Sequence, residues 1–96
     1  MTSYTVRVEL HGAESDEYEK LHEEMAKAGF EKVILIDGIY YELPTAEYSL
    51  VDSPLTTAEV TAKAFKAANN VQPEPVPSVL TTATDTPRMA IGLKPV

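Results

Sequence analysis

The 96-residue chain contains no cysteine, so disulfides, thiolate metal sites and a cysteine nucleophile are all excluded. No apolar run approaches the ~20 residues that a membrane-spanning helix needs. The N-terminus lacks the basic region and apolar block of a secretory signal. These absences predict a soluble, cytoplasmic protein with no membrane partner. The length suits a single domain with one core.

Basic residues are scarce. Lys and Arg number 8 against 15 Asp and Glu, and the formal net charge is −7. A broad nucleic-acid footprint needs a basic stripe, and none is present, so we expect no DNA footprint. Any RNA contact must then be local and specific. Six of the acids fall within residues 14–24, where a solvated helix face is the simplest interpretation.

The first regular stretch reads YTVRVELHG over residues 4–12. Its apolar residues alternate with polar ones, which is typical of a strand with one buried face. Residues 15–28 then change to a helical period, with one apolar stripe. Ser15 or Asp16 is the expected N-cap of this helix, and Gly29 is a suitable residue just past its end.

Two further strands are predicted over residues 30–36 and 46–51. Asp37 and Gly38 form a turn signal between the first of these and the segment 39–44. That segment looks extended but irregular, because it ends in a proline that cannot donate to a strand ladder.

The second helix has the clearest local signal. Thr56 and Glu59 match the capping box, in which each side chain accepts a hydrogen bond from the other residue's backbone. After a stiff Pro-rich connection over residues 72–77, the β-branched stretch 78–84 reads as a fourth strand. Residues 88–93 are predicted to form a short edge strand or a docked tail.

The order β, α, β, β, α, β predicts an α+β, ferredoxin-like domain that spans residues 1–96. We expect a four-stranded antiparallel sheet with both helices on one face. Residues 4–85 form the core of this domain, and 86–96 are a tail or an extra edge strand. An open sheet face and unpaired strand edges favour self-association, so a homodimer is expected.

Several marks along residues 4–85 resemble those of the GhoS family, the small antitoxins of type V toxin–antitoxin pairs. They are the strand 4–10 with its acid Glu9, the helix end Ala28-Gly29-Phe30, the hydrophobic strand 33–36, the turn Gly38-Ile39 and the sequence LTTAEV at 55–60. That family resembles the CRISPR-associated adaptation nucleases in fold. The resemblance implies an endoribonuclease that cleaves a single-stranded toxin message. Glu9 departs from the aspartate expected by analogy with the adaptation nucleases.

Arg7, Glu9 and His11 are the candidate catalytic residues. RNA cleavage through the 2′-hydroxyl needs a proton acceptor, a proton donor and a cation near the phosphate, and this strand face offers all three. Arg7 and His11 each lie ~7 Å from Glu9 along a strand, a span that suits a phosphodiester. The alternative interpretation is a solvated or dimer-facing row with a salt bridge to a neighbouring strand.

Lys20 is a candidate phosphate contact on the first helix. Tyr40 and Tyr41 are candidates for base stacking in an RNA site. Tyr48 is more simply a core residue, and His22 a partly exposed helix residue.

No cofactor is predicted. Glu9 with Asp52 or Glu47 would offer oxygen ligands to Mg²⁺, but nothing in their spacing requires a metal. No Gly-rich phosphate loop, Ser-His-Asp arrangement or nucleotide fingerprint is present. The alternative function is a non-catalytic ferredoxin-like adaptor, or a protein-binding antitoxin, that acts through its acidic surface.

Overall fold

A three-stranded antiparallel sheet is the centre of the computed structural model, which describes residues 2–96. The middle strand is β1 (Thr2–Glu9). It pairs with β4 (Glu47–Ser53) on one side and with β5 (Ser78–Thr84) on the other. Because β1 is hydrogen-bonded along both edges, its register determines the positions of the residues of β4 and β5 in the sheet.

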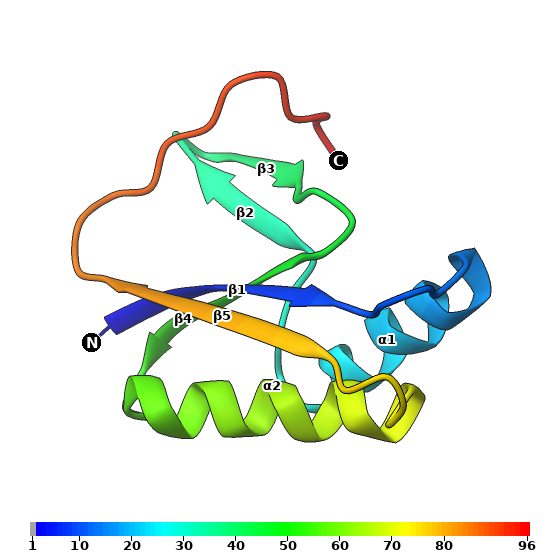
Figure 1. The fold of residues 1–96 in the computed structure, drawn as a ribbon. Coiled ribbons are helices and arrows are strands. Elements are labelled where there is room, and N and C mark those ends of the chain that lie inside the picture. Colours follow the sequence, from blue (N-terminus) through cyan, green and yellow to red (C-terminus); the bar gives the residue numbers. More distant parts are fainter. Residues whose placement is uncertain (1) are drawn as a thin grey trace.

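Two helices, α1 (Ser15–Lys27) and α2 (Thr57–Val71), cover one face of this sheet (Figure 1). The core between the layers is apolar and its central side chains are fully buried. They include Val6, Val8, Leu21, Met25, Tyr48, Val60 and Ala64. The predicted α+β class is confirmed. Within residues 2–96, neither helix combines the length and the apolar character needed to cross a membrane.

The strands β2 (Val33–Ile36) and β3 (Ile39–Glu42) form a hairpin of their own. Asp37 and Gly38 are the two residues of its turn, with φ values of 50° and 79°. Left-handed values at both positions define the tight turn whose twist suits antiparallel strands, and Asp-Gly is a favoured pair for it. Residues 39–44, predicted to be irregular, therefore supply a strand that pairs with β2.

The predicted four-stranded sheet is wrong. β2 pairs with β3, and within residues 2–96 the strand bridge that reaches β4 from this region is an isolated one, between Glu31 and Ser49. The Asp-Gly turn places β3 only two residues after β2, so β2 pairs with β3 and does not join the three-stranded sheet. The layout is otherwise consistent with a ferredoxin-like domain whose fourth strand has separated from the sheet.

The segment that follows β5 is a docked tail, not an edge strand of the sheet. It passes from β5 to the hairpin (Figure 1), where the Glu42 amide donates to the Lys94 carbonyl at 2.8 Å and the Val96 amide to the Tyr40 carbonyl at 3.0 Å. Hairpin and tail lie on the side of the sheet opposite α2. The face that we expected to be open is therefore partly covered.

The helix caps agree with the sequence at α2 and differ at α1. Thr56 Oγ1 accepts from the Glu59 amide at 3.1 Å, and Glu59 Oε1 accepts from the Thr56 amide at 2.8 Å, as predicted. At α1 the N-cap is Glu14, whose side chain makes no capping bond, so the predicted Ser15 or Asp16 cap is wrong.

We expect Thr56→Ala to lower the free energy of unfolding by about 1 kcal/mol, because it leaves helix amides of α2 without their capping partner. Chemical denaturation monitored by circular dichroism measures this loss. Ser15→Ala is the matched control, since Ser15 caps nothing, and it should change stability by less than about 0.5 kcal/mol. Equal losses in the two variants would contradict the assignment of the caps.

Candidate functional site

Arg7 and Glu9 lie side by side on the uncovered part of the sheet. Both are exposed. Their neighbours Val6 and Val8 are buried in the core beneath the helices, so Arg7 and Glu9 point to the opposite face of the sheet. Across the β1–β5 pairing, Arg7 is opposite Leu80 and Glu9 is opposite Ser78. Together these residues line a shallow hollow of about 230 Å³. Two of the three predicted catalytic residues thus share one concave surface.

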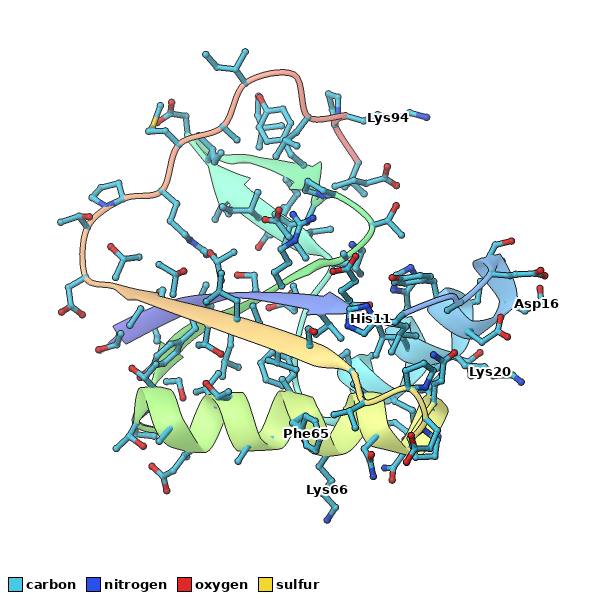
Figure 2. All side chains as sticks on the ribbon, viewed as in Figure 1. His11, Asp16, Lys20, Phe65, Lys66 and Lys94 are labelled. Atoms are coloured by element: carbon cyan, nitrogen blue, oxygen red, sulfur yellow. The ribbon has the colours of Figure 1, made fainter. Side chains whose placement is uncertain are left out.

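His11 is joined to this hollow through Ser78. It follows the C-terminal end of β1 (Figure 2), and its Nε2 lies 2.8 Å from Ser78 Oγ. The Gln72 side chain donates to the His11 carbonyl at 2.8 Å and holds the backbone there. Sequence reasoning missed Ser78, because nothing in the sequence shows which residue of β5 lies opposite Glu9.

An ion pair anchors Arg7 on its other side. Its guanidinium lies 3.6 Å from the Glu47 carboxylate on β4, yet the Arg7 side chain remains 61% exposed. Such an exposed pair adds little stability. The cross-strand salt bridge of the alternative interpretation is therefore present, and Arg7 still has donors that face solvent.

The predicted RNA-binding residues do not gather around the hollow. Lys20 is exposed on α1 and points away from the sheet (Figure 2). Tyr40 and Tyr41 belong to the hairpin, where Tyr41 is bridged to Pro95 of the tail and Tyr40 is half exposed. Any RNA that contacts both the hollow and the tyrosines would have to cross from the sheet to the hairpin.

The acids considered for a metal do not converge either. The residue after Asp52, Ser53, pairs with Thr2, whereas Glu9 is at the far end of β1, so about 20 Å separates the two carboxylates along the strand. Glu47 is paired with Arg7. Within residues 2–96, no group of three His, Asp or Glu side chains is placed to hold a metal ion.

A second polar cluster lies between α1 and the start of the hairpin. His22 Nδ1 is 2.6 Å from the hydroxyl of Tyr48, whose ring is fully buried as predicted. Lys32 Nζ lies 4.9 Å from the centre of that ring. The same ammonium donates to four backbone carbonyls, those of Leu43, Pro44, Thr45 and Glu47. Lys32 thereby ties the loop before β4 to the core.

Protonation in this cluster follows from its burial. Burial raises the pKa of the Tyr48 hydroxyl, so this group stays protonated and shares a hydrogen bond with His22 Nδ1. Burial, and next the charge of Lys32, lower the pKa of His22, while Glu19 opposes the shift. The hydrogen bond between His22 and Tyr48 anchors α1 to β4. Beyond the position of His22 at the margin of the apolar stripe, nothing in the sequence indicates this contact.

Comparisons with protein-family models, with curated proteins and with solved structures each found no match. Fold and site together define a small α+β protein with an exposed polar hollow on its sheet.

We expect the protein to lose stability as the pH falls below about 6.5, the ordinary pKa of histidine. The folded-state pKa of His22 is lower than its ordinary value of 6.5, so the unfolded chain takes up a proton first. This contribution is fully present above pH 6.5 and is lost as the pH falls toward the folded pKa. Thermal melting across this range should show a shallower slope in His22→Gln than in the wild type. Lys20→Ala, on the outer side of the same helix, should keep the wild-type slope.

Proposed function

We propose that this protein is an antitoxin-like endoribonuclease of the cytoplasm that cleaves a specific single-stranded RNA. The observation that carries the proposal is the exposed hollow of Arg7 and Glu9, with His11 linked to it through Ser78. The resemblance to the GhoS family supports the same reaction and suggests a toxin message as the substrate.

Each of the three side chains meets a separate chemical need. Glu9 accepts the proton of the 2′-hydroxyl as that oxygen attacks phosphorus, and His11 donates a proton to the 5′-oxygen as the P–O5′ bond breaks. Arg7 stabilises the charge that develops on the phosphoryl oxygens. The products are a 2′,3′-cyclic phosphate and a 5′-hydroxyl, and the reaction proceeds without a metal.

We expect Arg7→Ala to slow RNA cleavage about 100-fold, because one preorganised cationic donor contributes roughly 3 kcal/mol to the transition state. Glu9→Gln and His11→Ala should also lose activity. Cleavage of an RNA panel, with and without EDTA, measures the rates and the product ends. Lys66→Ala removes the same charge from the side of α2 away from the sheet (Figure 2) and should keep the wild-type rate.

Melting temperatures of these variants separate catalysis from folding, since substitutions of exposed strand residues change stability by under ~0.5 kcal/mol. If all three variants cleave at the wild-type rate, the row is not a catalytic site. Loss of activity on addition of EDTA would instead require a metal-dependent reaction.

Homodimerisation is the second part of the proposal. The sheet order leaves the outer edge of β5 without a partner strand among residues 2–96. β5 reads SVLTTAT, with neither charge nor proline, and its Leu80 side chain is 65% exposed. An uncharged, β-branched edge of this kind pairs readily with another strand. Two copies of β5, antiparallel about a two-fold axis, would extend the sheet and place two hollows near the interface.

Leu80→Lys should shift the protein from dimer to monomer, because it places two like charges in a symmetric edge-to-edge interface. Light scattering over a range of concentrations measures the mass of both forms. Val76→Lys, in the Pro-rich connection before β5, adds the same charge at another exposed apolar residue and should leave the dimer intact. A wild-type mass of ~10 kDa at every concentration would overturn this part of the proposal.

An acidic binding surface is the other candidate function. Among the six acids of residues 14–24, only Glu24 takes part in an ion pair within residues 2–96, with Lys27 at 3.0 Å. The remaining acids could form ion pairs with a basic protein partner. Pure protein that cleaves no RNA with or without EDTA, yet binds a basic partner, would favour this adaptor function.

A further inference from the structure

Arg88 is partly buried, and no carboxylate of residues 2–96 forms an ion pair with it. The tail carries its guanidinium onto the sheet, where Nη1 donates to the Tyr4 carbonyl at 3.3 Å and to Thr5 Oγ1 at 3.1 Å, and Nη2 donates to Ser49 Oγ at 2.9 Å. Within residues 2–96, the ion pairs are formed by other residues. A guanidinium has five N–H donors, so part of its capacity remains available to a ligand.

A cavity of about 310 Å³ lies next to this guanidinium, between the sheet, the hairpin and the tail. Its walls are of three kinds. Tyr40, Leu35 and Val51 provide half-exposed apolar and aromatic surface, Glu31 and Asp52 provide carboxylates, and Arg88 provides the cation. Asp52 has a left-handed φ of 50°, which aspartate tolerates, at the point where the β1–β4 register shifts.

This combination does not suit a simple anion. Two carboxylates on the wall would repel phosphate or a free carboxylate, even with Arg88 present. A planar ligand that presents acceptors along one edge and donors along another would pair with both the guanidinium and the carboxylates. Guanine does so, because arginine recognises its O6 and N7 and its Watson–Crick edge carries N–H donors that carboxylates accept. Its ring would lie against Tyr40.

We propose that this cavity binds a guanine base, with Arg88 on its O6/N7 edge, Asp52 or Glu31 on its N–H donors and Tyr40 against its ring. The inference deepens the proposed RNA cleavage, since it names the base that would select the substrate. The cavity and the hollow have no lining residue in common, although Thr5, which Arg88 contacts, is only two residues along β1 from Arg7, or about 7 Å. Guanine binding and cleavage are therefore testable independently.

The test uses the full chain carrying Glu9→Gln, so that RNA is not consumed. Calorimetric titration with GMP, AMP, CMP and UMP measures the preference for the free nucleotide. Uridine hexamers with and without one guanosine measure it within single-stranded RNA. We expect guanine ligands to bind roughly tenfold more tightly than the others. Tyr40→Ala should weaken every nucleotide roughly tenfold, because it removes the stacking surface.

Asp52→Asn is the sharpest variant. It keeps the side-chain shape and a residue type that tolerates left-handed φ, but it replaces an acceptor-only group with a mixed one. The guanine preference should fall several-fold, whereas Asp16→Asn, on α1 away from the cavity (Figure 2), should keep it. Arg88→Lys should also lose the preference, since an ammonium cannot span two acceptors.

Each outcome decides one of the two proposals. Guanine preference in a protein that cleaves no RNA would support the cavity as a base site and contradict the proposed nuclease activity. Cleavage without guanine preference, or a preference that Asp52→Asn leaves unchanged, would overturn the cavity as a base site. Inorganic phosphate that competes fully with GMP would show that Arg88 binds any anion, and it would also overturn the inference.

Discussion

The alternation of β1 is the constraint on which the other parts of the molecule depend. Val6 and Val8 are fully buried, and the residues between them face the opposite way. Hydrogen bonding to β4 and β5 on both edges locks this register. A slip of one residue would bury Arg7 and Glu9 in the core and expose the valines, at a cost of several kcal/mol. The position of the polar row is therefore a consequence of core packing and would be kept even if the row had no catalytic role.

Cover from the hairpin and the tail divides the outer face of the sheet into two parts. Arg88 bonds to the sheet at Tyr4, Thr5 and Ser49, so the N-terminal half of β1 lies beneath the tail. Ile34 and Leu43 are buried but lie outside the main core. The C-terminal half of β1 remains open, together with Leu80. The exposed hollow and the half-open cavity thus exist on the same sheet face because the cover is incomplete.

Local signals in the sequence predicted local structure well. The capping box of Thr56 and Glu59 gave the start of α2, and the alternation of residues 4–10 gave the two faces of β1. Long-range pairing could not be predicted in the same way. β2 would suit a sheet edge as well as a hairpin, and only the competition between β3 and β4 decides its partner. Ser78 and His11 are far apart in the chain, so their contact could not be predicted from local sequence. The four carbonyls around Lys32 depend on the conformation of a loop, and that conformation has no sequence pattern.

The charge distribution constrains how this protein could meet RNA. Its net charge of −7 opposes association at long range, and many of its acids are on α1, whereas Arg7 and Arg88 lie on the sheet face that the helices do not cover. If RNA is bound through Arg7 and Arg88, one or two phosphates would be neutralised on binding. Affinity would then depend weakly on salt, since each neutralised phosphate of a single strand contributes about 0.7 to the logarithmic slope. Recognition would have to come from short-range contacts, of which stacking and base-edge hydrogen bonds are the strongest available. An acidic protein that cleaves RNA needs a base-specific pocket more than a basic one does. Under the two proposals, this requirement would connect the hollow on β1 to the cavity beside Arg88.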